Sequence, residues 1–181
     1  SHGLVGQGVH QVEVEGLKMT RRFGYRRPCL RAVVHAANCA QAAEQKGVRT
    51  LVKFFGTRTA DELVAQGQKA DLLLGNNVLA HVPDLNDFVQ GLKRLLAPRG
   101  VITMEFPHLL RLIQQTQFDT IYHEHFSYLS LFTVEQVFRH HGLEIFDVEE
   151  LSTHGGSLRV FAQHANGPRS CADAVNTVLG D

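Results

Sequence analysis

The side chains best suited to chemistry lie in one short segment, residues 122–128, with the sequence YHEHFSY. Two histidines, a glutamate, two tyrosines and a serine would each need a hydrogen-bonding partner if this segment were buried core. A neutral imidazole can remove a proton, a nearby carboxylate can stabilise the resulting cation, and a phenol can bind a developing oxyanion. The segment therefore predicts a proton relay.

The spacing alone leaves open which histidine would meet a substrate. In an extended chain His123 and His125 would share one face, with Tyr122 and Glu124 on the other. A helix or an irregular loop would sort these side chains differently. We therefore take the proton relay as the property of the whole segment at this point.

A metal site is the second interpretation of the same residues. A His-x-His pair with a carboxylate can bind zinc or iron, provided that a third and a fourth ligand are present. His81 or His154 would have to supply them. This interpretation predicts a metal-dependent enzyme built on residues 123–125.

The elements that must position these residues alternate between strands and helices. We expect strands at 30–34, 49–55, 70–79 and 101–107, helices at 38–47, 59–67, 84–100 and 133–142, and a final strand pair at 143–151 and 157–164. The helix at 133–142 should begin with a Thr-x-x-Gln capping box, and residues 10–16 alternate like a further strand. The β-α-β pattern predicts an α/β fold with a mostly parallel sheet and an antiparallel final pair at its edge.

The strand ends predict where a ligand should bind. In an open parallel sheet, ligands lie outside the carboxyl ends of the strands. Segments 75–81, 105–110 and 152–157 each follow such an end, and segment 122–128 lies between the second and the third in sequence. Four segments that are distant in sequence should therefore meet at one edge, with His81 close to His125.

Each of these segments also has a purely structural interpretation. Asn76 and Asn77 could cap the element that follows, and His81 could be a solvated loop histidine. The paired glycines 155–156 could serve only the turn before the last strand.

Composition narrows the class of protein. The 181 residues are 44% hydrophobic and 20% charged, with 18 basic and 18 acidic residues, which is typical of a globular protein without an overall field for nucleic acid or a membrane. We expect no membrane span and no signal peptide, because the apolar runs are short. The three cysteines, Cys29, Cys39 and Cys171, form no paired pattern, which favours the reducing cytoplasm.

Four segments together resemble a known family. ADLLLGNNVLAHVPDLNDFV, GVITMEFPHLLRLI, FDTIYHEHFSYLSL and ELSTHGGSLRVFAQH are similar to the S-adenosylmethionine-dependent C-methyltransferases that act on nucleotide-linked keto-deoxysugars. The resemblance covers about residues 33–165, and its most specific parts are the HEH segment and the Thr-His-Gly-Gly-Ser turn. It implies a Rossmann-like class I methyltransferase sheet with helices on both faces.

The resemblance implies a reaction at a carbon next to a ketone, through an enolate. His125 matches the family's general base, while Tyr122, Glu124 and His81 match residues that surround it. Oxyanion stabilisation would matter as much as the base. The methyl group leaves a positive sulfonium, so the resemblance implies no metal in the reaction.

The resemblance also implies binding residues. The adenine of the cofactor would lie near Phe55 and Gly56, and its methionine part near Asn76, Asn77 and Val78. The substrate would be a small nucleotide-linked sugar. Its contacts would come from His123, His154, Gly155, Gly156 and Ser157.

The chain departs from the family near its start. Residues 12–16 retain a strand and one glycine but lack the family's glycine-containing loop, and His35 stands where the family has a glutamate that binds the ribose. Imidazole is a poor substitute for a bidentate carboxylate acceptor. The alternative function is therefore a methyltransferase-like remnant that no longer binds cofactor. We divide the chain into a degenerate segment 1–30, a methyltransferase core 31–165, and a linker or the start of a truncated region, 166–181.

Overall fold

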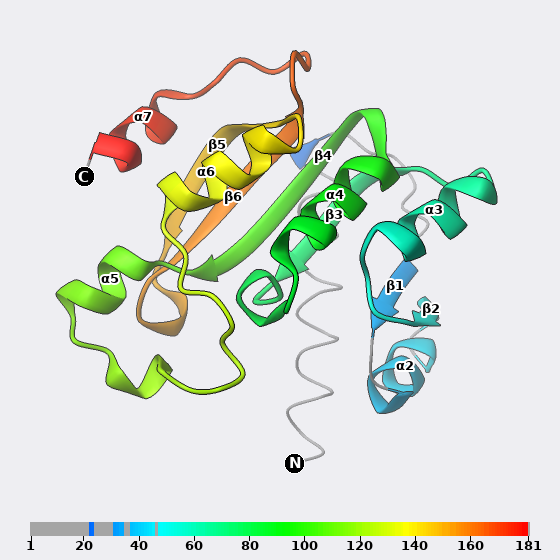
Figure 1. Cartoon of the computed structure of the whole chain (residues 1–181), viewed down its shortest axis with the longest axis horizontal. Helices are drawn as coiled ribbons and strands as arrows, with labels where there is room; N and C mark the ends of the chain where they lie inside the picture. The colour runs from blue at the N-terminus through cyan, green and yellow to red at the C-terminus, as the bar shows by residue number, and fades with distance from the viewer. Residues whose placement is uncertain (1–21, 24–30, 35–36, 46, 181) are drawn as a thin grey trace.

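The strands form two sheets in the computed structural model, which describes residues 22–23, 31–34, 37–45 and 47–180 (Figure 1). A parallel pair consists of β1 (Arg31–Val34) and β2 (Arg49–Val52). The larger sheet has the order β3-β4-β6-β5, built from β3 (Ala70–Asn76), β4 (Leu96–Pro107), β5 (Leu143–Leu151) and β6 (Ser157–His164). The predicted strand at 10–16 and His35 lie outside the described residues.

Strand directions confirm the predicted α/β fold class. Strands β3 and β4 are parallel, whereas β6 runs antiparallel to both of its neighbours, β4 and β5. The last strand is thus the antiparallel one, and it lies between β4 and the edge strand β5. Helices pack on one face of this sheet, and Arg22, which is helical, contacts the other.

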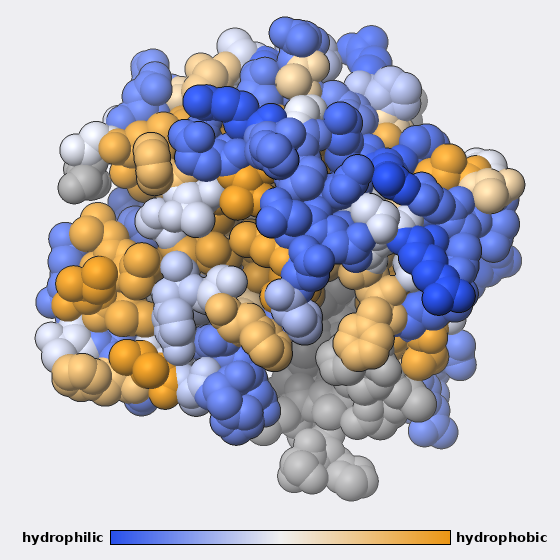
Figure 2. Space-filling view, in the orientation of Figure 1, coloured by the Kyte–Doolittle hydropathy of each residue, from blue (hydrophilic) through white to orange (hydrophobic). Residues whose placement is uncertain are grey.

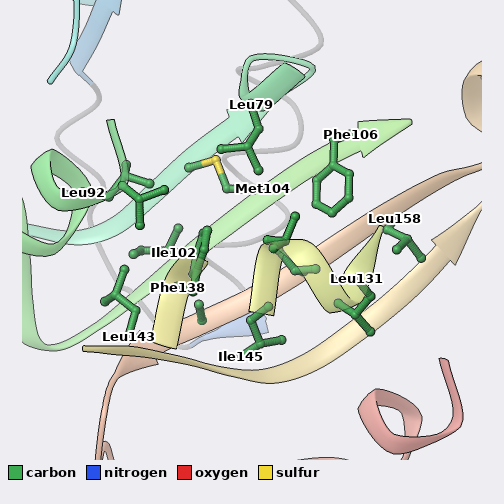
Figure 3. Close-up of a cluster of buried hydrophobic side chains, with 14 of the residues drawn as sticks. Leu79, Leu92, Ile102, Met104, Phe106, Leu131, Phe138, Leu143, Ile145 and Leu158 are labelled. Atoms are coloured by element: carbon green, nitrogen blue, oxygen red, sulfur yellow. The ribbon is translucent and has the colours of Figure 1, made fainter. Parts of the chain in front are cut away.

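One face of the four-stranded sheet is apolar and carries the main core. Alternation along β4 turns Ile102, Met104 and Phe106 to this face, where α4 (Leu85–Leu95) and α6 (Leu131–His140) cover them (Figure 3). Helix α7 (Asp173–Gly180) adds the buried Val175 to the same cluster. No described helix is long and apolar enough to cross a membrane.

The opposite face is rich in polar groups. Four side chains occupy one row across the sheet, at paired positions on neighbouring strands: Asn76, Glu105, Arg159 and Glu149. We call these four residues the polar row. Phe161 lies on the same face, two residues after Arg159 in β6. The Arg22 guanidinium lies over its ring, with 4.2 Å between the guanidinium carbon and the ring centroid.

Helix α4 ends earlier than predicted. Its start agrees with the expected Asp84 cap, whose carboxylate accepts a hydrogen bond from the Asp87 amide at 2.9 Å. The helix stops at Leu95, however, and the chain enters β4 at Leu96 instead of remaining helical to residue 100. Ala97 precedes a proline, which disfavours helical dihedrals at that residue.

Helix α6 begins earlier than predicted, and its cap is a different residue. The Ser130 hydroxyl accepts a hydrogen bond from the Thr133 amide at 3.2 Å, so the helix starts at Leu131. The predicted Thr133 capping box was therefore wrong. Leu131 is 1% exposed, and its burial adds a reason for the earlier start.

Short elements occupy the carboxyl edge of the larger sheet. They are η1 (Leu79–His81), α5 (Leu109–Gln114), η2 (Phe118–Thr120) and η3 (Thr153–Gly155). The sequence did not predict α5 or η2. Two further helices, α2 (Ala37–Glu44) and α3 (Thr57–Ala65), match the predicted helices at 38–47 and 59–67 within three residues at each end.

Candidate active site

The predicted meeting of segments 75–81 and 122–128 is confirmed. The imidazole rings of His81 and His125 lie 4.6 Å apart between centroids, although 44 positions separate them in sequence. The Ala80 carbonyl accepts a hydrogen bond from the Phe126 amide at 2.8 Å, which joins η1 to the histidine loop. Two strand ends therefore contribute to one cluster, as the topology requires.

The hydrogen bonds of His125 determine which ring nitrogen carries hydrogen. Its Nδ1 lies 2.8 Å from the Thr120 carbonyl oxygen, which can only accept, so Nδ1 donates. In the neutral ring Nε2 then holds the lone pair, and it accepts from the Tyr122 hydroxyl at 3.0 Å. The atom of His125 available as a base is therefore Nε2.

A turn determines which side chains of residues 122–125 face the cluster. The His125 amide donates to the Tyr122 carbonyl at 3.1 Å, so residues 122–125 turn rather than extend. The Tyr122 and His125 rings consequently meet, with 4.2 Å between centroids. The side chains of His123 and Glu124 are exposed.

Glu124 contributes to the cluster through its main chain. Nδ1 of His81 lies 2.9 Å from the Glu124 carbonyl oxygen, so His81 donates there and fixes the loop that carries His125. The expected neighbouring carboxylate instead points to solvent. A role for the Glu124 side chain beside the imidazole stays a prediction.

A small pocket opens beside His125. Apolar side chains form most of its wall, including Ala80, Pro107, Leu109, Leu112 and Tyr128. Three aromatic residues of the same loop, Tyr122, Phe126 and Phe118, are exposed by 42%, 60% and 73%, and the Tyr122 ring contacts His125. Figure 2 shows apolar side chains over the part of the molecule that carries α5. The imidazole thus borders a surface that favours an apolar or ring-shaped ligand.

The predicted cofactor residues at the end of β3 have an unusual feature. Both side-chain polar atoms of Asn76 are buried and have no hydrogen-bond partner within the described part of the chain. Asn77 adopts a φ of 53°, and its amide donates to the Glu105 carbonyl at 2.8 Å. A buried amide without partners is costly, and a polar ligand group next to Asn76 would remove that cost.

The predicted adenine residues do not all face outward. Phe55 packs edge-on against Phe88 of α4 with 5.4 Å between ring centroids. Gly56 is buried, and a Cβ atom there would overlap the Asp87 carboxylate. The exposed ring at this strand end is Phe54, which is 78% exposed and which the sequence analysis did not select.

The predicted substrate turn is bound largely to itself. The Thr153 carbonyl accepts from the Gly156 amide at 2.9 Å and from the Ser157 hydroxyl at 3.1 Å. Ser157 is 1% exposed and its hydroxyl already donates within the turn, so its predicted substrate contact stays a prediction. The backbone of His154 lies in η3, and Gly155 is exposed.

A buried ion pair, which was not predicted from the sequence, lies on the polar face of the sheet. The Arg159 guanidinium donates to the Glu105 carboxylate at 2.7 Å, and Thr153 Oγ1 donates to the same carboxylate at 3.1 Å. Glu105 is 2% exposed. A lone charge within the apolar run 101–107 was the available signal, because a buried charge requires a partner.

The metal interpretation gains no support from the described side chains. Among them, no group of three or more histidine, cysteine, aspartate or glutamate residues is arranged to hold a metal ion. His81 directs Nδ1 to a carbonyl, not to a shared centre with His123.

Comparison with known proteins gives a family match and sequence relatives. A family model described as a methyltransferase domain matches residues 15–148. C-methyltransferase NovU from Streptomyces niveus is 37% identical over 165 residues, which cover 91% of this chain and 39% of that protein. A ubiquinone biosynthesis O-methyltransferase from Bartonella tribocorum is 35% identical over 48 residues, covering 26% of this chain and 19% of that protein. The chain thus spans less than half the length of these two relatives.

Solved structures share the fold at low sequence identity. Magnesium protoporphyrin IX methyltransferase from Synechocystis, solved with bound SAH, has a TM-score of 0.61 and 12% identity, covering 89% of this chain and 86% of its own. A putative methyltransferase in complex with the Haloferax volcanii activator Trm112 has a TM-score of 0.63 and 11% identity, covering 85% and 79%. These similarities establish the fold.

Proposed function

The chain belongs to the methyltransferase domain family, and from this premise we propose that it forms the catalytic core of an S-adenosylmethionine-dependent C-methyltransferase. The proposed target is a carbon next to a ketone in a nucleotide-linked sugar. The observation that carries the proposal is the cluster of His81, Tyr122 and His125 at the carboxyl edge of the sheet. The name of the relative NovU, a C-methyltransferase, supports transfer to carbon.

In this proposal His125 is the general base. Nδ1 is held by the Thr120 carbonyl, so Nε2 keeps the lone pair that removes the carbon-bound proton. His125 lines the adjacent pocket, and the mostly apolar wall of that pocket would limit water beside the imidazole. His81 contacts the ring in a tilted arrangement and holds the loop through Glu124, which limits the orientations that His125 can adopt.

The Tyr122 hydroxyl has two roles in the proposal. Without substrate it donates to Nε2 of His125 at 3.0 Å. With substrate it would donate instead to the ketone oxygen, where negative charge develops as the proton leaves. The same rotation frees the Nε2 lone pair, so substrate binding and activation of the base are linked.

The residues around β3 fit the cofactor. Asn76 would form hydrogen bonds with the polar methionine part of S-adenosylmethionine, with Asn77 and Val78 beside it, and this would satisfy its buried amide. Bound cofactor supplies a methyl group on a positive sulfonium that a carbon nucleophile can attack. For the adenine, Phe54 offers an exposed ring next to Phe55 and Gly56.

Calorimetric titration with S-adenosylmethionine tests the cofactor part of the proposal. We expect micromolar affinity, and His125→Ala should retain it because His125 faces the substrate side. In protein that is active in methyl transfer, His125→Ala should abolish transfer of labelled methyl groups to a nucleotide-linked keto-deoxysugar. Loss of cofactor affinity in this variant would instead show that His125 is structural.

A remnant that no longer binds cofactor is the second candidate, favoured by His35 at the position of the ribose carboxylate. Absence of measurable S-adenosylmethionine binding would support it. Replacing His35→Glu should then restore affinity, by about 1–3 kcal/mol if charged hydrogen bonds to the ribose form.

A further inference from the structure

Three hydrogen bonds, connected through the residues Gln117 and Thr120 themselves, link the turn at residues 153–156 to the imidazole of His125. The Gln117 side-chain amide donates to the Gly155 carbonyl at 2.7 Å. The main-chain carbonyl of Gln117 accepts from Thr120 Oγ1 at 2.8 Å, and the main-chain carbonyl of Thr120 accepts from Nδ1 of His125 at 2.8 Å. Gln117 is therefore the residue through which two separate parts of the site are connected.

We propose that Gln117 is a positioning residue that couples the 153–156 turn to the tautomer and orientation of His125. The coupling rests on the proposed function, in which Nε2 of His125 is the base. When Gln117 holds the turn, η2 keeps the Thr120 carbonyl in front of Nδ1, and Nε2 keeps its lone pair. When that hold is lost, the ring is free to turn or to exchange its hydrogen between the two nitrogens.

The turn is shaped to receive Gln117. Gly155 has a φ of +75°, and a Cβ atom there would lie 2.5 Å from Gln117 Nε2, so only glycine permits this contact. The second hydrogen of the same amide group is also used, because Nε2 donates to Gln115 Oε1 at 2.7 Å. The amide is thus fixed in one orientation.

The backbone before Gln117 is strained, which is a second and independent observation. Thr116 has a φ of +54°, a left-handed conformation that is unfavourable for a β-branched residue. Strain of this kind persists where surrounding structure enforces it, and it concentrates at functional sites. Here it directs the next residue, Gln117, toward the turn.

The variant that tests the coupling is Gln117→Glu, which keeps the size of the side chain and removes its donor. The matched control is Gln114→Glu in the same region, where the exposed side chain only accepts from Arg111. In the 181-residue chain, ¹⁵N chemical shifts of the His125 ring report which nitrogen carries hydrogen. We expect the wild type and Gln114→Glu to show hydrogen on Nδ1, and Gln117→Glu to show a mixture.

Activity provides a second readout. In protein that is active in methyl transfer, Gln117→Glu should lower kcat by about 10- to 100-fold, as expected for a misplaced base, and leave KM nearly unchanged. Gly155→Ala should disturb the tautomer in the same way from the other end of the contact. Combining it with Gln117→Glu should add little, because both changes break one connection.

The outcomes separate this inference from the proposed function. An unchanged His125 tautomer in Gln117→Glu, with the thermal midpoint also unchanged, would overturn the coupling. Additive effects of Gln117→Glu and Gly155→Ala on kcat would also overturn the coupling. If the wild type transferred no methyl group, the proposed function would fail, yet the ring shifts would still decide whether Gln117 controls His125.

Discussion

The two faces of the four-stranded sheet are built by opposite means. On one face Ile102, Met104 and Phe106 lie under α4 and α6, with no polar side chain needed among them. On the other face the polar row brings a buried carboxylate, a guanidinium and an amide together. The apolar face stabilises the fold through burial, whereas the polar face depends on pairing, and it ends at the proposed site.

Stability and function are separable because the two faces contribute to them differently. A residue on the apolar face contributes in proportion to the area that it buries, and its loss is felt as stability alone. A residue on the polar face contributes through its partner. Its effect therefore depends on whether that partner is another side chain, a ligand, or absent.

The largest expected effect comes from removing one member of the buried ion pair. Arg159→Met leaves the Glu105 carboxylate buried without its guanidinium, and we expect a loss of about 3–5 kcal/mol in the free energy of unfolding. Urea denaturation measures it.

The double variant Glu105→Gln with Arg159→Met is the control for that experiment. Replacing both charges should restore most of the lost stability, because no unpaired charge remains. Equal destabilisation by the single and the double variant would show that the polar face behaves like the apolar one, and the contrast between the faces would fail.

The second largest effect should appear at Asn76, where the expected changes in stability and binding have opposite signs. Asn76→Leu removes a buried amide that has no partner in the described structure, so the cofactor-free chain should become more stable. Affinity for S-adenosylmethionine should fall by about 1–3 kcal/mol, because hydrogen bonds to the ligand are lost. Thermal unfolding and calorimetry measure the two quantities.

The control for that pair of measurements is Ile102→Val on the apolar face. It should cost about 0.5–1.5 kcal/mol of stability and leave cofactor affinity unchanged. If Asn76→Leu also destabilised the free chain and left affinity unchanged, Asn76 would be structural.

A smaller effect on stability is expected at a buried polar residue for which neither a side-chain partner nor a ligand has been proposed. Thr103 is fully buried on the polar face, and its Oγ1 has no hydrogen-bond partner within the described residues. Thr103→Val preserves the shape and removes the unpaired hydroxyl, so we expect stabilisation of about 1 kcal/mol. A loss of stability in urea would reveal a hydrogen bond that Thr103 makes in solution.

The sequence predicted the apolar face and the location of the site better than the partners within it. Periodicity identified β4 and the face of α4, and the strand-end rule brought His81 to His125. The Glu105–Arg159 pair was missed because alternation assigns a residue to a face but does not give the register between strands distant in sequence.

Short-range conformation limited the rest of the prediction. Whether residues 122–125 extend or turn depends on local hydrogen bonds that spacing does not encode, so the exposure of Glu124 could not be foreseen. The turn at residues 154–157 was assigned to the substrate from the family resemblance, and strand alternation places Ser157 on the same face of the sheet as Arg159 and Phe161. Gln117 has no motif, and its importance appears only from its contacts.

The smallest expected effect lies in the helices that cover the apolar face. Burial lowers the pKa of His141 below its ordinary value of 6.5, and His140 and Lys93 nearby act in the same direction. Because the unfolded chain binds this proton more readily, stability is fully present above about pH 6.5 and decreases as the pH falls below it. His141→Gln should therefore flatten the dependence of the urea midpoint on pH between about 7 and 5, and His140→Gln, which removes only a neighbouring charge, should flatten it less.

His141 also donates to Asn86 Oδ1 at 2.9 Å, so the variant should be slightly less stable at neutral pH. A steeper loss of stability in acid for His141→Gln would mean that the charged imidazole stabilises the helix end. The helices that cover the apolar face would then also depend on paired polar groups.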